Sequence, residues 1–271
     1  MKKLLLFVAM LIVVSLSAEW VDVSVNSQLF DHNSTRNDLT NVNFTLDGYE
    51  LETIEESGET YQKISYWNEG QFIEEGKPDL PRFTRLIAIP DAGEVAIEIV
   101  NHDEQIVQNM NIYPRQKLQI ESEPIRNEFV IDTQFYAGND VFPQKIVEIG
   151  KPAIMRNHRV VAVTFNPFQY NPATKELRII SNIEVSVETS GRGGENVKTR
   201  NLKKSRYFEK LYESTILNYS SVQNRDDEYQ NPSILFIYRN NATVENYIEY
   251  LADWKHTKGF EVTLASTSVT G

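Results

Sequence analysis

The chain has 271 residues and no cysteine, and 41% of its residues are hydrophobic. This length and composition are typical of a folded protein with one or two domains and argue against a disordered chain. The formal net charge of −11 at pH 7 argues against binding to nucleic acid or to an anionic membrane surface, since both require clustered positive charge.

Residues 1–18 have the features of a secretory signal peptide. Lys2 and Lys3 precede an apolar run from Leu4 to Val14, and small residues follow it. Because the run is too short to span a bilayer, we predict a cleaved signal that exports the chain to the cell surface or the medium. An exported chain without cysteine forms no disulfides, so its core alone must stabilise it.

Residues 19–189 are predicted to form a β-sandwich. Apolar and polar residues alternate in many short runs, of which the clearest contains Leu177, Ile179, Ile183, Val185 and Val187. Turn signals such as Asp47–Gly48 and Asn171–Pro172 separate these runs. The alternation is typical of strands with one buried and one solvated face.

Residues 190–231 are predicted to be a linker that contains a short helix. The stretch opens with Ser190–Gly191–Arg192–Gly193–Gly194, and basic residues are frequent up to Arg206. This composition is typical of a solvent-exposed linker, and also of a site that trypsin-like proteases cleave. One helical face between residues 206 and 219 is apolar and carries Phe208, Leu211, Tyr212, Ile216 and Tyr219.

Residues 232–271 are predicted to begin an α/β domain. A buried strand at 233–238 is followed by a helix with apolar residues at helical spacing, and a second strand follows Gly259. One strand–helix–strand unit cannot bury its own faces, so we expect the rest of the domain to lie beyond Gly271. The predicted fold class is therefore mainly β, with a β-sandwich followed by the truncated start of an α/β domain.

No catalytic or cofactor site is predicted from the residues. The four histidines are scattered without metal-ligand spacing, at His32, His102, His158 and His256. The sequence contains no Gly-x-Ser-x-Gly motif, phosphate loop, dinucleotide fingerprint or calcium loop. We therefore expect no cofactor and no bound metal.

Four stretches, in this order along the chain, carry a family resemblance. They are Gly76–Pro81 with its Gly-x-Pro-x-Leu-Pro pattern, Phe135–Pro143, Asn166–Leu177, and Tyr250–Gly259 with its Trp-Lys before a glycine. Together they resemble the propeptide and the first catalytic-domain elements of the gingipain family of cysteine endopeptidases.

This resemblance implies a fold and a function. In that family an all-β propeptide caps and inhibits a caspase-like α/β peptidase domain and is removed by proteolysis. The chain would then be the N-terminal part of a secreted zymogen whose intramolecular partner is its own downstream peptidase domain. The catalytic His and Cys would follow the residues given, so the chain alone would be inactive.

The resemblance also implies an inhibitory loop. In arginine-specific members, a propeptide loop after a strand that ends in Pro places a basic side chain in the specificity pocket. Counted from Pro114, this position falls on Glu121, which departs from the family and puts arginine specificity in doubt. The nearby basic residues Arg115, Lys117 and Arg126 are the alternatives, and each could equally be ordinary surface charge.

A processing junction is implied in the same way. Arg225 resembles the family's junction position, and Lys204 and Arg206 are the second candidates. The further partner is then the processing protease that cuts there.

A second hypothesis comes from a different class of protein. The chain could be a secreted β-sandwich adhesion or glycan-binding module fused to a non-catalytic α/β domain or an export-machinery scaffold. Tyr66, Trp67 and Phe72 around Gly70 could stack on sugars, although core packing would also explain these rings.

Overall fold

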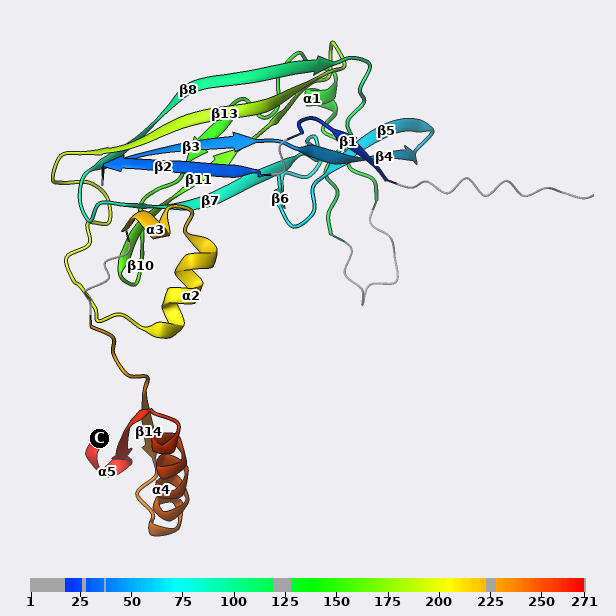
Figure 1. Cartoon of the computed structure of the whole chain (residues 1–271). Coiled ribbons are helices and arrows are strands. Elements are labelled where there is room, and N and C mark those ends of the chain that lie inside the picture. The colour runs from blue at the N-terminus through cyan, green and yellow to red at the C-terminus, as the bar shows by residue number, and fades with distance from the viewer. Residues whose placement is uncertain (1–17, 26–27, 37, 119–127, 223–227, 271) are drawn as a thin grey trace, which may run out of the picture. The chain divides into compact units, whose positions relative to one another are not determined.

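The computed structural model describes residues 18–25, 28–36, 38–118, 128–222 and 228–270 (Figure 1). The chain forms two compact units, each made of several stretches of sequence. The sandwich unit comprises Met1–Arg85, Val95–Lys151 and Ala162–Thr189, and the C-terminal unit comprises Leu86–Glu94, Pro152–Val161 and Ser190–Gly271. Apart from Ala18, the predicted signal peptide lies outside the described residues, and the boundaries predicted at 189 and 231 stay predictions.

Most of the strands belong to antiparallel sheets (Figure 1). One has the order β12–β13–β3–β2, with β8 also paired to β13; its strands are Phe168–Asn171 (β12), Glu176–Ser190 (β13), Leu39–Thr45 (β3), Phe30–Arg36 (β2) and Glu94–Val107 (β8). A second has the order β10–β11–β7–β6, with β9 paired to β11; its strands are Ala153–Met155 (β10), His158–Phe165 (β11), Pro81–Ile89 (β7), Gly70–Gln71 (β6) and Val147–Ile149 (β9). A third, β1–β4–β5, consists of Glu19–Asp22, Gly48–Glu56 and Glu59–Ser65.

The sandwich core forms where the first two sheets face each other. Burial along β3 alternates strictly, which places Val42 and Phe44 inward as their spacing predicts. The ring centroid of Phe44 lies 5.0 Å from that of Phe83 on β7 and 5.4 Å from that of Phe165 on β11. Since these rings come from opposite sheets, the predicted β-sandwich is confirmed.

The C-terminal unit holds most of the helical residues. The helix predicted for 206–219 is divided into α2, Arg206–Thr215, and α3, Tyr219–Val222. Ile216 between them has an extended backbone, and it is buried in a cluster with Tyr212, Tyr219, Ala88 and Val160. Burying each large side chain of this cluster stabilises the unit by about 1.5–3 kcal/mol.

Arg159 fastens the start of the predicted linker to the rest of the C-terminal unit. Its buried guanidinium donates to the carbonyls of Pro90 at 3.0 Å, Gly93 at 2.9 Å and Glu195 at 2.7 Å. The amide of Gly93 also donates to the carbonyl of Gly193 at 2.6 Å. A composition typical of solvated linkers therefore coexists here with specific tertiary contacts.

The predicted strand–helix–strand unit is present at the C-terminal end. Ser233–Tyr238 (β14) and Glu261–Ser266 (β15) pair in parallel and are connected through Ala242–Thr257 (α4), with a last turn at Thr267–Thr270 (α5). Parallel pairing requires such a crossover, and Asn241 caps α4 by accepting from the amide of Thr243 at 2.9 Å. Leu235 and Ile237 of β14 are 57% and 61% exposed, so two strands and one helix leave apolar surface uncovered.

No helix within the described ranges is both long and apolar enough to cross a bilayer.

Candidate functional site

The candidate inhibitory segment starts and ends on a common support within the sandwich unit. We call Tyr113–Leu118 and Glu128–Asp132 the two sides of the loop stem. Between them lie residues 119–127, which include the candidates Glu121 and Arg126 and are outside the described residues. The other two candidates, Arg115 and Lys117, belong to the N-terminal side of the stem.

Gly76 contacts both sides of the stem. Its amide donates to the carbonyl of Arg115 at 2.8 Å, and its carbonyl accepts from the amide of Asp132 at 3.0 Å. Its backbone is left-handed, with φ +81°, and a Cβ at this position would lie 2.7 Å from the nitrogen of Asp132. Glycine is required here because no other residue combines this conformation with this approach. The Gly-x-Pro-x-Leu-Pro motif thus has a physical role as the support of the stem.

Arg115 is anchored inside this support. Its Nη1 donates to Asp79 Oδ1 at 3.2 Å and to Gln71 Oε1 at 2.5 Å, and the Asp79 side chain is only 4% exposed. Burial raises the pKa of Asp79, and the neighbouring Arg115 offsets part of this rise. These contacts give Arg115 an anchoring role, whereas Lys117 is exposed.

The two sides of the stem are joined directly by Gln116. Its side-chain oxygen accepts from the amide of Val130 at 2.8 Å, and its Nε2 donates to the carbonyl of Val130 at 2.7 Å. The Gln116 side chain thus makes the two hydrogen bonds to Val130 that the backbone of a neighbouring strand residue would otherwise make. Next to this pair, the ring of Phe129 packs against Tyr61 at 5.8 Å and Tyr113 at 5.9 Å.

Asp132 ends the stem and starts the short helix α1, Thr133–Tyr136. It accepts from the amide of Phe135 at 2.9 Å and forms a salt bridge with Lys77 Nζ at 2.8 Å. The hydrogen bond from Lys77 is the main cause of the lowered pKa of Asp132. The motif that contains Lys77 and Asp79 is visible in the sequence, but the contacts of Asp79, Gln116 and Asp132 are not, because their partners are distant in sequence.

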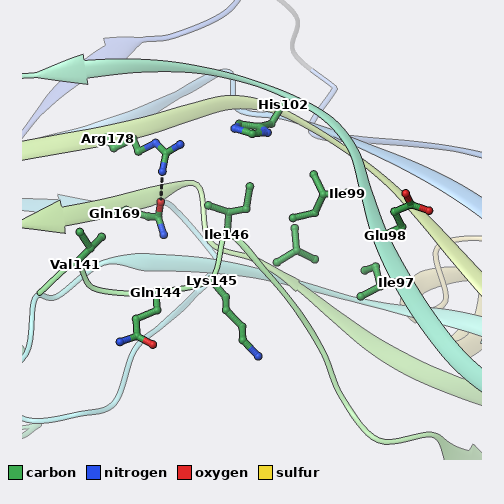
Figure 2. Close-up of a pocket in the computed structure, with 11 residues that line it drawn as sticks. Ile97, Glu98, Ile99, His102, Val141, Gln144, Lys145, Ile146, Gln169 and Arg178 are labelled. Atoms are coloured by element: carbon green, nitrogen blue, oxygen red, sulfur yellow. Dashed lines mark hydrogen bonds between the residues drawn. The ribbon is translucent and has the colours of Figure 1, made fainter.

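A groove of about 830 Å³ lies elsewhere in the sandwich unit, between β8 and residues 141–147 (Figure 2). Its lining includes Ile97, Ile99, Ile146 and Arg178, and Figure 2 shows Arg178 directed at Gln169, to which it donates at 3.0 Å. None of the described residues that line it is Phe, Tyr or Trp, so these residues offer no stacking platform for a sugar.

The three aromatic residues considered for glycan binding do not form a common surface either. Phe72 is buried and packs on Phe142 at 4.8 Å. Tyr66 packs on Phe83 at 5.0 Å, and its hydroxyl donates to Asp47. Trp67 is 84% exposed. Core packing therefore accounts for two of the three rings.

No group of three or more His, Asp or Glu side chains within the described ranges could hold a metal ion.

The family of the chain follows from comparison with known proteins. Residues 23–233 match the profile of the Propeptide_C25 family. The chain belongs to this family. The predicted resemblance to gingipain precursors is confirmed, and the loop stem and its support lie inside the matched residues.

Relatives and solved structures agree with this assignment. The chain is 29% identical over 229 residues to Gingipain R1 of Porphyromonas gingivalis, and 28% identical over 271 residues to Lys-gingipain of the same organism. These alignments cover 83% and 96% of this chain but only 23% and 15% of the relatives.

A complex of the pro- and mature domains of RgpB from P. gingivalis contains a chain similar to this one, with a TM-score of 0.63 and 27% identity. The match covers 71% of this chain and 97% of that chain. A structure of gingipain K, described as an insight into its zymogenic latency, shares the fold with a TM-score of 0.57 at 23% identity, covering 65% of this chain and 100% of that chain. The mainly β fold is thus that of gingipain propeptides.

The second processing candidates lie in the C-terminal unit. Lys204 is buried, its amide donates to the carbonyl of Glu228 at 3.1 Å, and its carbonyl accepts from Gln230 at 2.7 Å. Arg206 is exposed and begins α2. Because proteases cut exposed, flexible backbone, these contacts disfavour a cut after Lys204 in the folded protein. Arg225 lies outside the described residues.

His158 is half-buried and packs against the helices α2 and α3 of the C-terminal unit. Its ring lies 4.7 Å from the ring of Tyr212 and 5.2 Å from that of Tyr219. Burial lowers the pKa of His158; the charges of Glu209 and Asp91 oppose this shift, whereas those of Lys198 and Lys204 add to it. The folded protein therefore favours the neutral imidazole.

We expect acid to destabilise the C-terminal unit through His158. Because the folded-state pKa lies below the unfolded value of about 6.5, unfolded chains bind the proton more readily, and stability falls as the pH drops through 6.5 towards the folded pKa. Urea midpoints measured between pH 7.5 and 5 should fall less steeply for His158→Phe than for the wild type. His102→Gln alters an exposed histidine of the sandwich unit and should behave as wild type. Equal slopes for all three proteins would contradict the prediction.

Proposed function

We propose that this chain is the N-terminal part of a secreted gingipain-like cysteine endopeptidase zymogen, in which residues 19–225 cap and inhibit the downstream peptidase domain. The observation that carries the proposal is the likeness to the RgpB pro-domain, whose solved structure is a complex with the mature domain. The absence of cysteine from the chain agrees with a catalytic Cys located further along the precursor.

The inhibitory contact is made by the segment that the loop stem presents. Lys117, Glu121 and Arg126 are the candidates for the peptidase cleft. Arg115 is better placed as an anchor, because its guanidinium is bonded to Asp79 and Gln71. The support on both sides of the stem favours an inhibitory contact here, since stem residues fixed before binding lose less entropy when the propeptide docks.

The proposal includes export of the precursor and removal of its propeptide. The signal peptide at residues 1–18 directs the precursor out of the cell, to the surface or the medium. A processing protease then cuts after Arg225, with Arg206 and the buried Lys204 as less favoured sites. Neither nucleic acid nor a membrane is a partner of the exported chain, in keeping with its negative charge.

One preparation tests both the inhibition and the junction. The full-length precursor is allowed to mature, the peptidase is purified and its N-terminus sequenced, and residues 19–225, produced separately, are added back. We expect the peptidase to start at Asp226 and to be inhibited at about one equivalent. A start far from Asp226 would contradict the junction alone, whereas no inhibition by an excess of residues 19–225 would contradict the proposed function.

A further inference from the structure

The geometry points to Gln116, supported by Gly76 and Asp79, as the positioning residue that sets how tightly this propeptide inhibits its peptidase. The inference rests on the proposed function and deepens it, because it concerns the stem of the inhibitory loop and not the side chain that enters the cleft.

Two independent sets of contacts hold the stem, one in the interior of the sandwich unit and one nearer to residues 119–127. Deep in the sandwich unit, the segment from Gly76 to Asp79 lies between the two sides and is hydrogen-bonded to both. The backbone amide of Asp79 donates to the carbonyl of Tyr113 at 2.9 Å, and the carbonyl of Gly76 accepts from the amide of Asp132 at 3.0 Å. Further out, Gln116 bonds both backbone groups of Val130. The deep contacts are backbone-to-backbone and part of the fold, while the outer contact depends on one side chain.

The outer contact can be removed without opening the core. Val130 is 40% exposed and Gln116 is partly exposed, so water can bond the amide and carbonyl of Val130 once the Gln116 side chain is gone. The deep contacts to Gly76 and the packing of Phe129 remain. Loss of Gln116 therefore releases the two sides of the stem from each other at Gln116 and Val130, while the sandwich stays folded.

Freeing one end of a loop makes its ordering on binding more costly. The freed stem residues must then lose conformational entropy when the propeptide docks, and the loss appears as weaker inhibition. Three hydrogen bonds of Gln116 are involved, since its Nε2 also donates to the carbonyl of Pro114 at 2.9 Å. At the net strength of exposed hydrogen bonds, their loss should weaken inhibition about tenfold.

The experiment compares full-length precursors, each carrying Arg225→Ala to slow processing and each shown by gel electrophoresis to be uncut. In this Arg225→Ala background, the precursor without a further change, called wild type below, is compared with Gln116→Ala, Gln116→Glu and Gln108→Ala. Initial activity is measured on peptide amides with Arg, Lys or another residue before the scissile bond, well below the unfolding temperature of every variant. Gln108→Ala is the matched control, because Gln108 makes an exposed side-chain bond to Glu176 in the same unit.

We expect the uncut Gln116→Ala precursor to be about ten times more active than the wild-type and Gln108→Ala precursors, with an unfolding midpoint within about 2 °C of theirs. Gln116→Glu keeps the acceptor for the amide of Val130 and loses the donor for its carbonyl, so its activity should be intermediate. Equal latency of Gln116→Ala and wild type overturns the inference and leaves the proposed function standing. A wild-type precursor that is fully active while uncut overturns both.

Discussion

Replacing Arg159 with methionine is expected to lower the free energy of unfolding of the C-terminal unit by about 3–5 kcal/mol. The guanidinium is fully buried and donates to the carbonyls of Pro90, Gly93 and Glu195. Methionine matches much of the side-chain volume but donates no hydrogen bond, so the buried carbonyl of Gly93 would lose its donor where water has poor access, and the partly buried bonds to Pro90 and Glu195 would be lost with it. Urea unfolding followed by tryptophan fluorescence and circular dichroism measures the loss.

The matched control for this change is Arg36→Met. Arg36 forms salt bridges with the side chains of Asp38 and Glu188, but its own side chain is 60% exposed. Its replacement should cost less than about 1 kcal/mol. Because Arg159 also holds Glu195, Arg159→Met should speed tryptic cutting at Arg192, Lys198 or Arg200, and an unchanged cutting rate would contradict the anchoring role of Arg159.

The second large effect is expected at Gly76. Gly76→Ala should lower the free energy of unfolding of the sandwich unit by about 2–4 kcal/mol, since it combines left-handed backbone strain with displacement of Asp132. The new Cβ would lie 2.7 Å from the nitrogen of Asp132, which is backbone and cannot turn aside as a flexible side chain would. Displacing Asp132 moves the C-terminal side of the loop stem, so inhibition should weaken as well.

Gly58→Ala separates these two causes. Gly58 has a φ of +83°, close to that of Gly76, but nothing lies within 4 Å of a Cβ built there. It should therefore show the backbone strain alone, about 1 kcal/mol, and leave inhibition unchanged. Equal losses of stability and inhibition for the two variants would show that the approach of Gly76 to Asp132 has no special role.

The sequence predicts the sandwich well because its signal is local. Alternation with a period of two places Phe44 inward, and the facing rings Phe83 and Phe165 come from other strands with the same pattern. The helix at 206–219 is predicted less well, because burial of Ile216 against Ala88 and Val160 favours an extended residue in the middle of a helical pattern. Such long-range contacts override local periodicity.

The candidate site is harder to predict for the same reason. The motif at Gly76–Pro81 is visible in the sequence, but its partners Arg115 and Asp132 are recognised only when the fold brings them to Gly76. Likewise, the glycines at 191–194 indicate a solvated linker, whereas a single arginine on a distant strand holds the adjoining residue Glu195. Basic residues near the stem also look alike in sequence, and only the structure distinguishes the anchored Arg115 from the exposed Lys117.

The backbone pairing of Lys204 with residues 228–230 bears on what a processing cut does. Lys204 bonds Glu228 and Gln230 through its own amide and carbonyl, and residues 205–227 connect these two paired positions along the chain. A cut anywhere between residues 205 and 227 breaks a peptide bond but none of these hydrogen bonds. Cleavage and dissociation are therefore separate events. After the cut, the two parts of the precursor are still joined by the hydrogen bonds of Lys204, and they separate only when these bonds open.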